Sequence, residues 1–435
     1  MPQALDIPAS AAQATTPYRR IAWRLMPLLL VCYLFAHLDR INIGFAKAQM
    51  SADLHFSDTV YGFGAGLFFI AYALCGVPSN LALERVGPRR WIALLMVVWG
   101  LLSAGMFLVQ TPGAFYLLRF LLGAAEAGFF PGILVYLARW FPARRRGSVT
   151  ALFALAVPLA GVLGGPLSGA LLEAFREGPL LRGWQWMFLL EGLPVVLLGL
   201  LVLRALPDGY QSVHWLDERQ KARLQQDFAQ EEAAKPVTSA AGLLRSGHLW
   251  LLVAIYCAVM LAVNTLAFWM PALIHGAGIG SDGQVGLLSA LPYLAGCVFM
   301  LAAGRSSDRH RERRWHLCVP LLMAALGLAL ASLLPQAPWP VMLGLVLAGM
   351  GASAALPQFW QLPPAFLGQR TLAAGIGLIS SLGSIASFGA PFFIGWMRDT
   401  TQSSALALQV LAMLIALGAL LVLRTPARLV NPQGH

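Results

Sequence analysis

The chain has 435 residues, of which 58% are hydrophobic and only 11% are charged. Soluble domains carry about a quarter charged residues, so this chain cannot cover its surface with polar groups and is an integral membrane protein. The net charge of +11 does not indicate a nucleic-acid partner, because the basic residues lie in short clusters between apolar runs and no nucleic-acid-reading motif is present.

Twelve apolar segments are long enough to cross a membrane, since a helix needs about 20 such residues to span the hydrocarbon core. The first is too long for the apolar region of a signal peptide, so we expect it to be retained. The five cysteines fall within apolar segments and form no CxxC pair, which argues against a disulfide framework or a metal site. The expected spans cover residues 23–46, 57–83, 89–110, 113–139, 146–172, 184–205, 245–272, 282–304, 315–334, 338–362, 370–395 and 403–424.

The distribution of lysine and arginine predicts that both termini are cytoplasmic. With the N-terminus inside, 24 of these 30 residues fall in cytoplasmic segments and four on the opposite side. Positive residues concentrate in the cytoplasmic loops of membrane proteins, so the asymmetry indicates the orientation. Arg40 and Arg119 lie within spans. The exceptions on the opposite side are Lys47, Arg176, Arg182 and Arg398.

The two halves of the chain repeat one another. The segment NLALERVGPRRW (80–91) follows the second span, and GRSSDRHRERRW (304–315) follows the eighth. Duplicated units of this kind recur in transporters, which bind substrate near the membrane midplane between the repeats. A constant offset of 224 residues relates three pairs of positions: Glu84 and Asp308, Arg146 and Arg370, and Gly165 and Gly389.

A polar insert separates the first six spans from the last six. We therefore expect an N-terminal six-helix bundle (1–205), a cytoplasmic linker (206–244) and a C-terminal six-helix bundle (245–435). Within the linker, residues 212–235 place apolar side chains at helical spacing, which predicts an amphipathic helix on the cytoplasmic face. A tether between two moving halves is the favoured role of this segment, ahead of any binding role.

Seven motifs lie between residues 37 and 370: HLDRINIGFA (37–46), VPSNLALERVGPRRW (77–91), LLRFLLGAAEAGFFPG (117–132), RWFPARRRG (139–147), PLAGVLGGPLSG (158–169), GWQWMFLLEGLP (183–194) and LPPAFLGQR (362–370). They resemble the motifs of the major facilitator superfamily, and specifically of its anion:cation symporter family. That family comprises bacterial organic-acid permeases, including tartrate, sugar-acid, phthalate and hydroxyphenylacetate carriers.

The resemblance implies an all-α membrane protein with 12 transmembrane helices in two pseudo-symmetric six-helix bundles. A central cavity would be lined mainly by the first, fourth, seventh and tenth helices. The resemblance also implies that a proton moves together with a small organic anion, without any further cofactor. We expect a monomeric carrier embedded in the lipid bilayer of the bacterial inner membrane.

Acid–arginine loops follow the second and eighth spans. By the resemblance, their side chains latch the two bundles together at the cytoplasmic face. Loops that only set the topology are the alternative, but topology requires no acid beside the arginines. The expected gating residues are Glu84, Arg85, Arg89, Arg90, Asp308 and Arg309.

Four ionisable residues lie inside the first and fourth spans. At about 1.5 Å per residue, Asp39, Arg40 and Arg119 share one depth and Glu126 lies roughly 10 Å deeper, near mid-membrane. An ionisable residue within a membrane usually marks a functional site, although a buried pair that only pins helices together is the alternative. For Glu191, a further acid in the sixth span, we expect a structural role.

These residue types suit the coupling of a proton to an organic anion. Arginine keeps its charge and binds a carboxylate through two parallel hydrogen bonds. Burial and a nearby arginine shift the pKa of a carboxyl in opposite directions. We therefore expect Asp39 and Glu126 to couple the proton and to occupy the arginines when they are ionised. Their protonation would free Arg40, and with it Arg119, to bind the substrate carboxylate.

The second half lacks matching charges, so we expect neutral side chains to contact the body of the substrate. Helix-packing hydrogen bonds are the alternative for each of them singly. His37 is either a group that titrates near neutral pH or a neutral hydrogen-bonding residue. The small number of amides favours an aromatic or short dicarboxylic acid over a sugar acid. The expected contacts, besides the arginines, are His37, Tyr72, Asn264, Trp269, Tyr293, Gln358, Gln361, Ser381 and Ser384.

Two other functions are compatible with this sequence. A proton-driven exporter of organic acids or drugs is the main alternative, although the arginines disfavour cationic drugs. A membrane enzyme or a transporter-like sensor is the second, but no HExxH, phosphate-binding or nucleophile motif is present. The segment GVLGGPLSG (161–169) resembles a drug-antiporter motif, yet its glycines recur every four residues, which predicts close helix packing instead.

Overall fold

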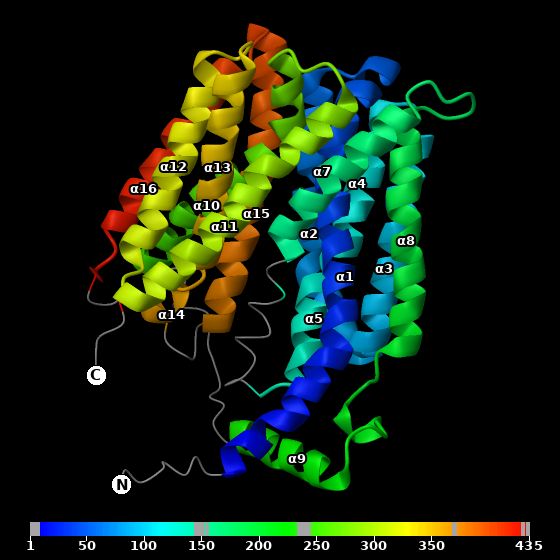
Figure 1. The fold of residues 1–435 in the computed structure, drawn as a ribbon, viewed down its shortest axis with the longest axis vertical. Helices are drawn as coiled ribbons and strands as arrows, with labels where there is room; N and C mark the ends of the chain where they lie inside the picture. The colour runs from blue at the N-terminus through cyan, green and yellow to red at the C-terminus, as the bar shows by residue number, and fades with distance from the viewer. Residues whose placement is uncertain are drawn as a thin grey trace, which may run out of the picture.

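The protein is an assembly of helices in two bundles (Figure 1). The computed structural model describes residues 9–142, 153, 156–232, 245–367, 372–427 and 431. Twelve helical segments within these residues are long and apolar enough to cross a membrane. The predicted fold class and the number of spans are therefore confirmed.

The first bundle contains the described helices up to residue 205. The predicted start of the fifth span, at 146–155, lies almost entirely outside the described residues. The bundle comprises α1 (Ala9–Leu54), α2 (Asp58–Val86), α3 (Pro88–Gly105), the 3-10 turn η1 (Met106–Leu108), α4 (Pro112–Glu126), α5 (Phe129–Ala138), α7 (Ala156–Ala174) and α8 (Gly183–Ala205).

The second bundle follows a polar connection that contains two short elements, η2 (Tyr210–Ser212) and α9 (Glu218–Glu232). The predicted linker boundary at residue 244 lies outside the described residues. The bundle comprises α10 (Gly247–Gly276), α11 (Asp282–His310), α12 (Arg314–Leu333), α13 (Pro338–Phe359), α14 (Pro363–Phe366), α15 (Leu372–Thr401) and α16 (Ala405–Leu423).

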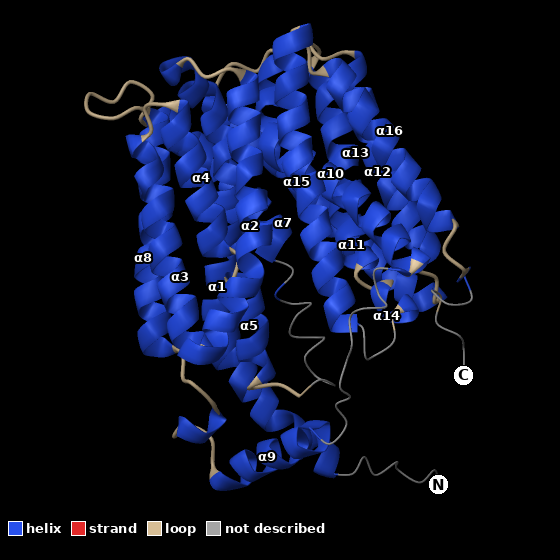
Figure 2. Ribbon diagram, turned by 180° about the vertical axis from the view of Figure 1, so that it is seen from behind, coloured by secondary structure: helices blue, strands red, loops and turns tan. Residues whose placement is uncertain are grey.

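Three pairs of helices bring the bundles together. α2 packs along α15, α7 along α11, and α1 against α10. Figures 1 and 2 show the bundles converging at the end opposite to α9, the start of α1 and the end of α16. We name the converging end the distal end and the end with α9 the proximal end.

Glycines allow the close approach at two of these pairs. A Cβ added to Gly165 on α7 would lie 2.6 Å from the carbonyl oxygen of Gly286 on α11. A Cβ added to Gly62 on α2 would collide with the carbonyl oxygen of Pro391 on α15. Gly62 and Gly286 are 224 residues apart, so the two contacts are related by the repeat. The packing role predicted for the glycine segment of α7 agrees with the structure.

The fourth span is interrupted near its middle, where α4 ends at Glu126 and α5 begins at Phe129. Pro131 has no N–H group to donate to the carbonyl of Ala127, so the regular hydrogen-bond ladder cannot continue through this turn. Gly128 lies within the break, where an added Cβ would collide with the side chain of Ser79 on α2. The break therefore places Glu126 at the end of a helix, beside irregular backbone.

The connecting helix α9 lies within the predicted amphipathic segment and is attached to the first bundle. Leu216 and Leu224 are almost completely buried and belong to the same apolar core as the start of α1. The hydroxyl of Tyr18 on α1 donates to the Asp227 carboxylate on α9 over 2.5 Å. α9 therefore packs against protein through its apolar side.

We expect Gly62→Ala to lower the thermal midpoint of the purified protein by a few degrees, because the added methyl group would force α2 away from α15. Gly76→Ala on the same helix is the matched control, since no atom lies within 4 Å of its added Cβ. Alanine in place of glycine stabilises a helix by about 1 kcal/mol where space allows. Differential scanning fluorimetry measures both midpoints, and equal values would contradict the tight contact.

Candidate functional site

An ion pair joins the first and fourth spans inside the first bundle. Arg40 Nε donates to Glu126 Oε2 over 2.8 Å. The Glu126 side chain is fully buried, whereas that of Arg40 is 21% exposed. Among the described residues, Glu126 Oε1 has no hydrogen-bond partner. The pair therefore has one buried member and one that a ligand can reach.

Asp39 precedes Arg40 but points toward α3. Its carboxylate accepts hydrogen bonds from Trp99 Nε1 and Ser103 Oγ, each over 3.0 Å. It forms no ion pair with Arg40 or Arg119 in the described structure, so the expectation that it occupies an arginine when ionised is wrong for this conformation. Consecutive helix residues are about 100° apart around the axis, so Asp39 and Arg40 cannot face the same neighbour.

Arg119 on α4 is also buried, with 1% of its surface exposed. Its Nη2 donates to the Ala65 carbonyl oxygen over 3.3 Å. Its Cζ lies 5.0 Å from the ring centroid of Phe68, and Arg40 Cζ lies 5.4 Å from the same centroid. Arg119 interacts electrostatically with Glu126 without direct contact. No ligand can reach Arg119 in this conformation, so its role in substrate binding stays a prediction.

Aromatic side chains lie beside Arg40. Its Cζ lies 5.1 Å from the ring centroid of Tyr72. Tyr33, two turns before Arg40 on α1, stacks on Phe153 with 4.2 Å between centroids. His37 meets the Tyr33 ring edge-on at 4.4 Å, and its Nδ1 lies 3.2 Å from the Tyr33 carbonyl oxygen. Two predicted contacts, His37 and Tyr72, therefore lie beside Arg40.

The second bundle contributes Tyr256 on α10 to these surroundings. Tyr256 interacts electrostatically with Arg40, and its ring centroid lies 5.0 Å from that of Trp360. On either side of Trp360 in sequence, the side-chain oxygens of Gln358 and Gln361 are buried and have no hydrogen-bond partner among the described residues. A buried amide oxygen without a partner is costly. These two oxygens are therefore candidates for a bound ligand, as predicted for both glutamines.

Two other predicted contacts on α10 are engaged with neighbouring helices. Asn264 Nδ2 donates to the Met260 carbonyl oxygen over 2.8 Å and to Ser387 Oγ over 3.1 Å. Trp269 Nε1 donates to the Pro391 carbonyl oxygen over 3.3 Å. Both side chains join α10 to α15, which corresponds to the helix-packing alternative. Their contact with substrate stays a prediction.

The remaining predicted contacts lie on α11 and α15. The ring of Tyr293 occupies the space that a Cβ of Gly161 would need, so Tyr293 packs between the bundles. Ser384 Oγ donates to the Ser380 carbonyl oxygen of its own helix over 3.1 Å. Ser381 is exposed. None of these three side chains contacts Arg40 or Glu126 in the described structure.

The predicted gating residues do not join the bundles in this conformation. Arg89 alone has side-chain partners within the described part of the chain, Asp208 at 3.0 Å and the Leu203 carbonyl oxygen at 2.9 Å, both on the first-bundle side. The latch therefore stays a prediction for a conformation in which the proximal ends meet. The residues without a described side-chain partner are Glu84, Arg85, Arg90, Asp308 and Arg309, all exposed.

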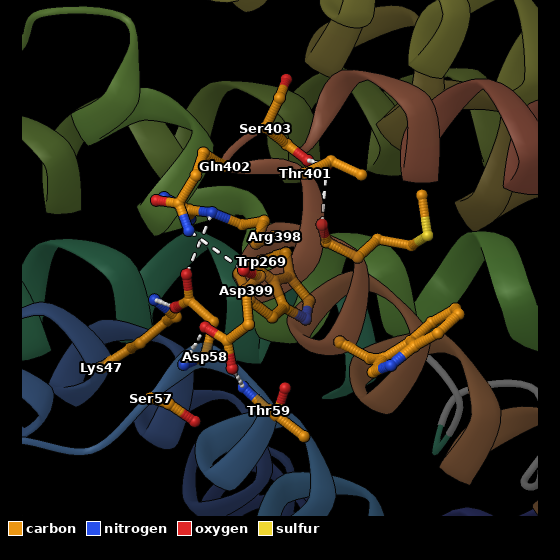
Figure 3. A network of polar contacts seen from close by, with 12 residues as sticks. Lys47, Ser57, Asp58, Thr59, Trp269, Arg398, Asp399, Thr401, Gln402 and Ser403 are labelled. Carbon is orange, nitrogen blue, oxygen red and sulfur yellow. Dashed lines mark hydrogen bonds and ion pairs between the residues drawn. The ribbon is translucent and has the colours of Figure 1, made fainter.

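A charged cluster joins the bundles at the distal end (Figure 3). Asp58, the first residue of α2, pairs with Lys47 of α1 at 2.5 Å and with Arg398 of α15 at 3.2 Å. Asp399 accepts hydrogen bonds from the backbone N–H groups of Asp58 and Thr59 over 3.1 and 2.7 Å. A carboxylate at a helix N-terminus satisfies free N–H groups and interacts favourably with the helix dipole. We name Lys47, Asp58, Arg398 and Asp399 the α2 cluster.

A second cluster joins the start of α11 to the first bundle. Gln49 Nε2 donates to Asp282 Oδ2 over 2.7 Å. Glu173, near the end of α7, accepts from Ser281 Oγ over 2.9 Å and from the Gly283 N–H over 3.3 Å. We name Gln49, Glu173, Ser281 and Asp282 the α11 cluster. Asp282, the first residue of α11, lies 224 residues after Asp58, the first residue of α2. The two clusters therefore occupy equivalent positions in the repeat.

Sequence reasoning missed both clusters. Lys47 and Arg398 entered it only as exceptions to the charge distribution. The available signal was the Ser-Asp pair that begins each helix, at 57–58 and again at 281–282. Serine followed by an acid is typical of a helix N-terminus. The partners of these helix starts come from the opposite half of the chain, which no local pattern indicates.

The family model that matches the chain is that of the Major Facilitator Superfamily, over residues 29–391. "Putative metabolite transport protein NicT" of Pseudomonas putida is 45% identical over 418 residues, which is 95% of this chain and 95% of that protein. A "Putative tartrate transporter" of Agrobacterium vitis is 44% identical, covering 94% of each chain. A "Quinolone resistance transporter" of Acinetobacter baumannii is 39% identical, covering 94% of this chain and 95% of that protein.

Among solved structures, a D-xylose-proton symporter superposes with a TM-score of 0.72 at 16% sequence identity. The match covers 93% of this chain and 98% of the symporter. At this identity the likeness concerns the fold alone.

We expect Asp399→Asn to open the distal end more often, because the helix start of α2 loses its charged cap. A cysteine introduced at Phe63, which packs between α2 and α15 against Phe392, would react about two to five times faster with a membrane-impermeant maleimide. A charge at an exposed helix end contributes about 0.3–1 kcal/mol, which corresponds to that range.

Asp53→Asn is the matched control for this substitution. Asp53 lies at the same end, but its partners among the described residues are Arg182 and Trp184 of its own bundle. If the two variants react at the same rate, the α2 cluster does not hold the bundles together.

Proposed function

The chain belongs to the Major Facilitator Superfamily and is a membrane transporter rather than an enzyme, and from this premise we propose that it takes up an organic carboxylate together with a proton. We propose further that it lies in the bacterial inner membrane with its proximal end cytoplasmic. The asymmetric distribution of lysine and arginine supports that orientation.

The observation that carries the proposal is the unequal burial of the Arg40–Glu126 pair. Glu126 occupies one edge of the guanidinium and leaves Arg40 partly exposed beside the aromatic rings. A proton on Glu126 removes its charge and frees the Arg40 Nε–H for another acceptor. A substrate carboxylate then replaces Glu126, because Arg binds carboxylates through two parallel hydrogen bonds. The site keeps the same net charge when a proton and an anion enter together.

The sequence suggests that Asp39 pairs with an arginine, but in this scheme it has a different role. It interacts electrostatically with Glu126 while bonding to Trp99 and Ser103 of α3. We propose that Asp39 takes part in proton coupling through its electrostatic interaction with Glu126 and not by pairing with an arginine. A proton on Asp39 removes a negative charge near Glu126 and alters the two hydrogen bonds that hold α1 to α3.

The aromatic surroundings of Arg40 support a flat carboxylic acid as the substrate. The Tyr72 ring lies beside the Arg40 guanidinium, and Tyr256, which interacts with Arg40 electrostatically, packs on Trp360. Aromatic rings of this kind pack well against an aromatic or short planar acid. Gln358 and Gln361 offer acceptors for a donor group on the same molecule. The tartrate-named relative supports a carboxylate more broadly.

Alternating access follows from where the bundles touch. The α2 and α11 clusters close the distal end, and the described contacts leave the gating residues of the proximal end without partners across the bundles. In the proposed orientation this is an inward-facing carrier. Return to the outward-facing form requires both distal clusters to separate and the proximal loops to meet.

Export of an aromatic compound is the second candidate, favoured by the relative named for quinolone resistance. The same site would then carry the proton into the cell and the substrate out of it. Uptake of radiolabelled carboxylic acids by intact cells that express the protein separates the two functions. Accumulation above the external concentration supports uptake, and accumulation below that of control cells supports export.

We expect Glu126→Gln to abolish accumulation driven by an imposed pH gradient in proteoliposomes while substrate exchange continues, because the amide cannot gain or lose the proton. Asp39→Asn should also lose accumulation. Glu191→Gln is the control: this buried acid bonds to Ser168 on α7, and the amide oxygen preserves that bond. Full accumulation by both the Glu126 and the Asp39 variants would exclude the proposed coupling.

We expect Arg40→Lys to raise the substrate KM about tenfold or more with little loss of maximal rate. Lysine retains the charge but lacks the planar pair of donors, and a charge-assisted hydrogen bond contributes about 1.5–3 kcal/mol. A thermal-shift screen of carboxylic acids identifies the substrate, and transport assays then give both constants. An unchanged KM would show that the substrate carboxylate binds elsewhere.

A further inference from the structure

A polar cavity lies at the proximal end of the first bundle, away from the Arg40 site. Its volume is about 540 Å³. Four separate parts of the chain form its walls: α1, the start of α3, the end of α8 and the connection before α9. The lining residues are Arg24, Leu25, Arg89, Arg204, Ala205, Leu206, Pro207, Asp208, Ser212 and Trp215.

Three guanidinium groups and a single carboxylate line this cavity. Asp208 neutralises Arg89, whose Nη1 it meets at 3.0 Å. Arg24 Cζ lies 4.9 Å from the ring centroid of Trp215, which orients that guanidinium by a cation–π contact. Within the part of the chain that the structure describes, neither Arg24 nor Arg204 has a carboxylate partner. The cavity therefore carries an excess of positive charge and suits a compact anion.

The cavity lies at the level where the spans leave the hydrocarbon. Arg89 is the second residue of α3, and Arg204 is the penultimate residue of α8. Trp23, next to Arg24, is 72% exposed, and tryptophan is typical of the membrane–water interface. Leu200 and Leu203, in the last two turns of α8, are exposed apolar side chains. Phospholipid phosphates occupy this same level.

We propose that this cavity binds the phosphate headgroup of an anionic phospholipid. Arg24 and Arg204 bind the phosphate oxygens, and the acyl chains lie along the exposed leucines of α8. The bound headgroup bridges α1, α8 and the connection before α9, and it therefore fixes the start of the linker to the first bundle. The site is independent of the substrate and of the direction of transport.

The test uses the purified full-length protein in detergent with added phosphatidylglycerol. We expect phosphatidylglycerol to raise the thermal midpoint by several degrees, with bound lipid visible by native mass spectrometry. Phosphatidylcholine at the same concentration should do neither. In the double variant Arg24→Gln/Arg204→Gln, the affinity should fall about thirtyfold, since one arginine near an anionic headgroup contributes roughly fivefold.

A matched double variant separates this site from general surface charge. Arg219→Gln/Arg305→Gln removes the same charge from exposed positions at the same end, outside the cavity, and it should bind phosphatidylglycerol as the native protein does. Equal lipid affinity in the two double variants would overturn the proposal.

Two further arms complete the experiment. The single variant Arg204→Gln changes an exposed side chain, so it should fold and lose about fivefold in affinity. Full native affinity would overturn the proposal. Inorganic phosphate and glycerol 3-phosphate test a soluble anion as the occupant. A midpoint shift with either of them as large as that with phosphatidylglycerol would also overturn the assignment to a lipid.

Discussion

An unpaired charge is costly inside a membrane, and the Arg40–Glu126 contact satisfies this constraint within the first bundle. Because arginine stays charged, the site always needs one negative group beside Arg40. Ionised Glu126 supplies it in the empty carrier, and a carboxylate substrate would supply it when Glu126 carries a proton. A carrier that has bound only the proton, or only the anion, would hold an unbalanced charge in an apolar interior. Coupling between proton and substrate would then follow from charge balance, without a separate signal between sites.

The two repeated halves of the chain are similar in their helix packing but differ in their buried charged residues. Both halves contribute equivalent helices to the interface, and the starts of α2 and α11 are both bonded by carboxylates of the opposite bundle. The ionisable pair has no such counterpart. Asn264 occupies the position related to Arg40 and bonds to Ser387 of its own bundle. The first half therefore carries the charges, whereas the second offers rings and amides. A duplicated scaffold can keep its packing symmetric while one copy alone performs the charge chemistry.

The fold was predictable because its evidence is additive. The composition, the twelve apolar runs and the constant 224-residue offset each depend on many residues. An untypical residue at one position therefore does not change the predicted fold. The site depends on rotation about single helices. Asp39 and Arg40 lie at one depth, yet one faces α3 and the other faces α4. Depth counted along straight helices also separated Arg40 from Glu126 by roughly 10 Å. Arg40 Nε nevertheless lies 2.8 Å from Glu126 Oε2, because counting along straight helices ignores the reach of both side chains and the end of α4 at Glu126. The contacts between bundles in the α2 and α11 clusters join residues more than a hundred positions apart, so no local sequence pattern indicates them.

The carboxylates of Glu173 and Asp399 sit near the C-terminal ends of their own helices, where the dipole disfavours negative charge. Each finds a favourable environment only at the N-terminus of a helix in the opposite half. Separation of the halves at this end would leave both anions in an unfavourable field at the same moment. Opening toward that side therefore has an energetic cost, because two carboxylates on different bundles lose their helix N-termini in the same movement.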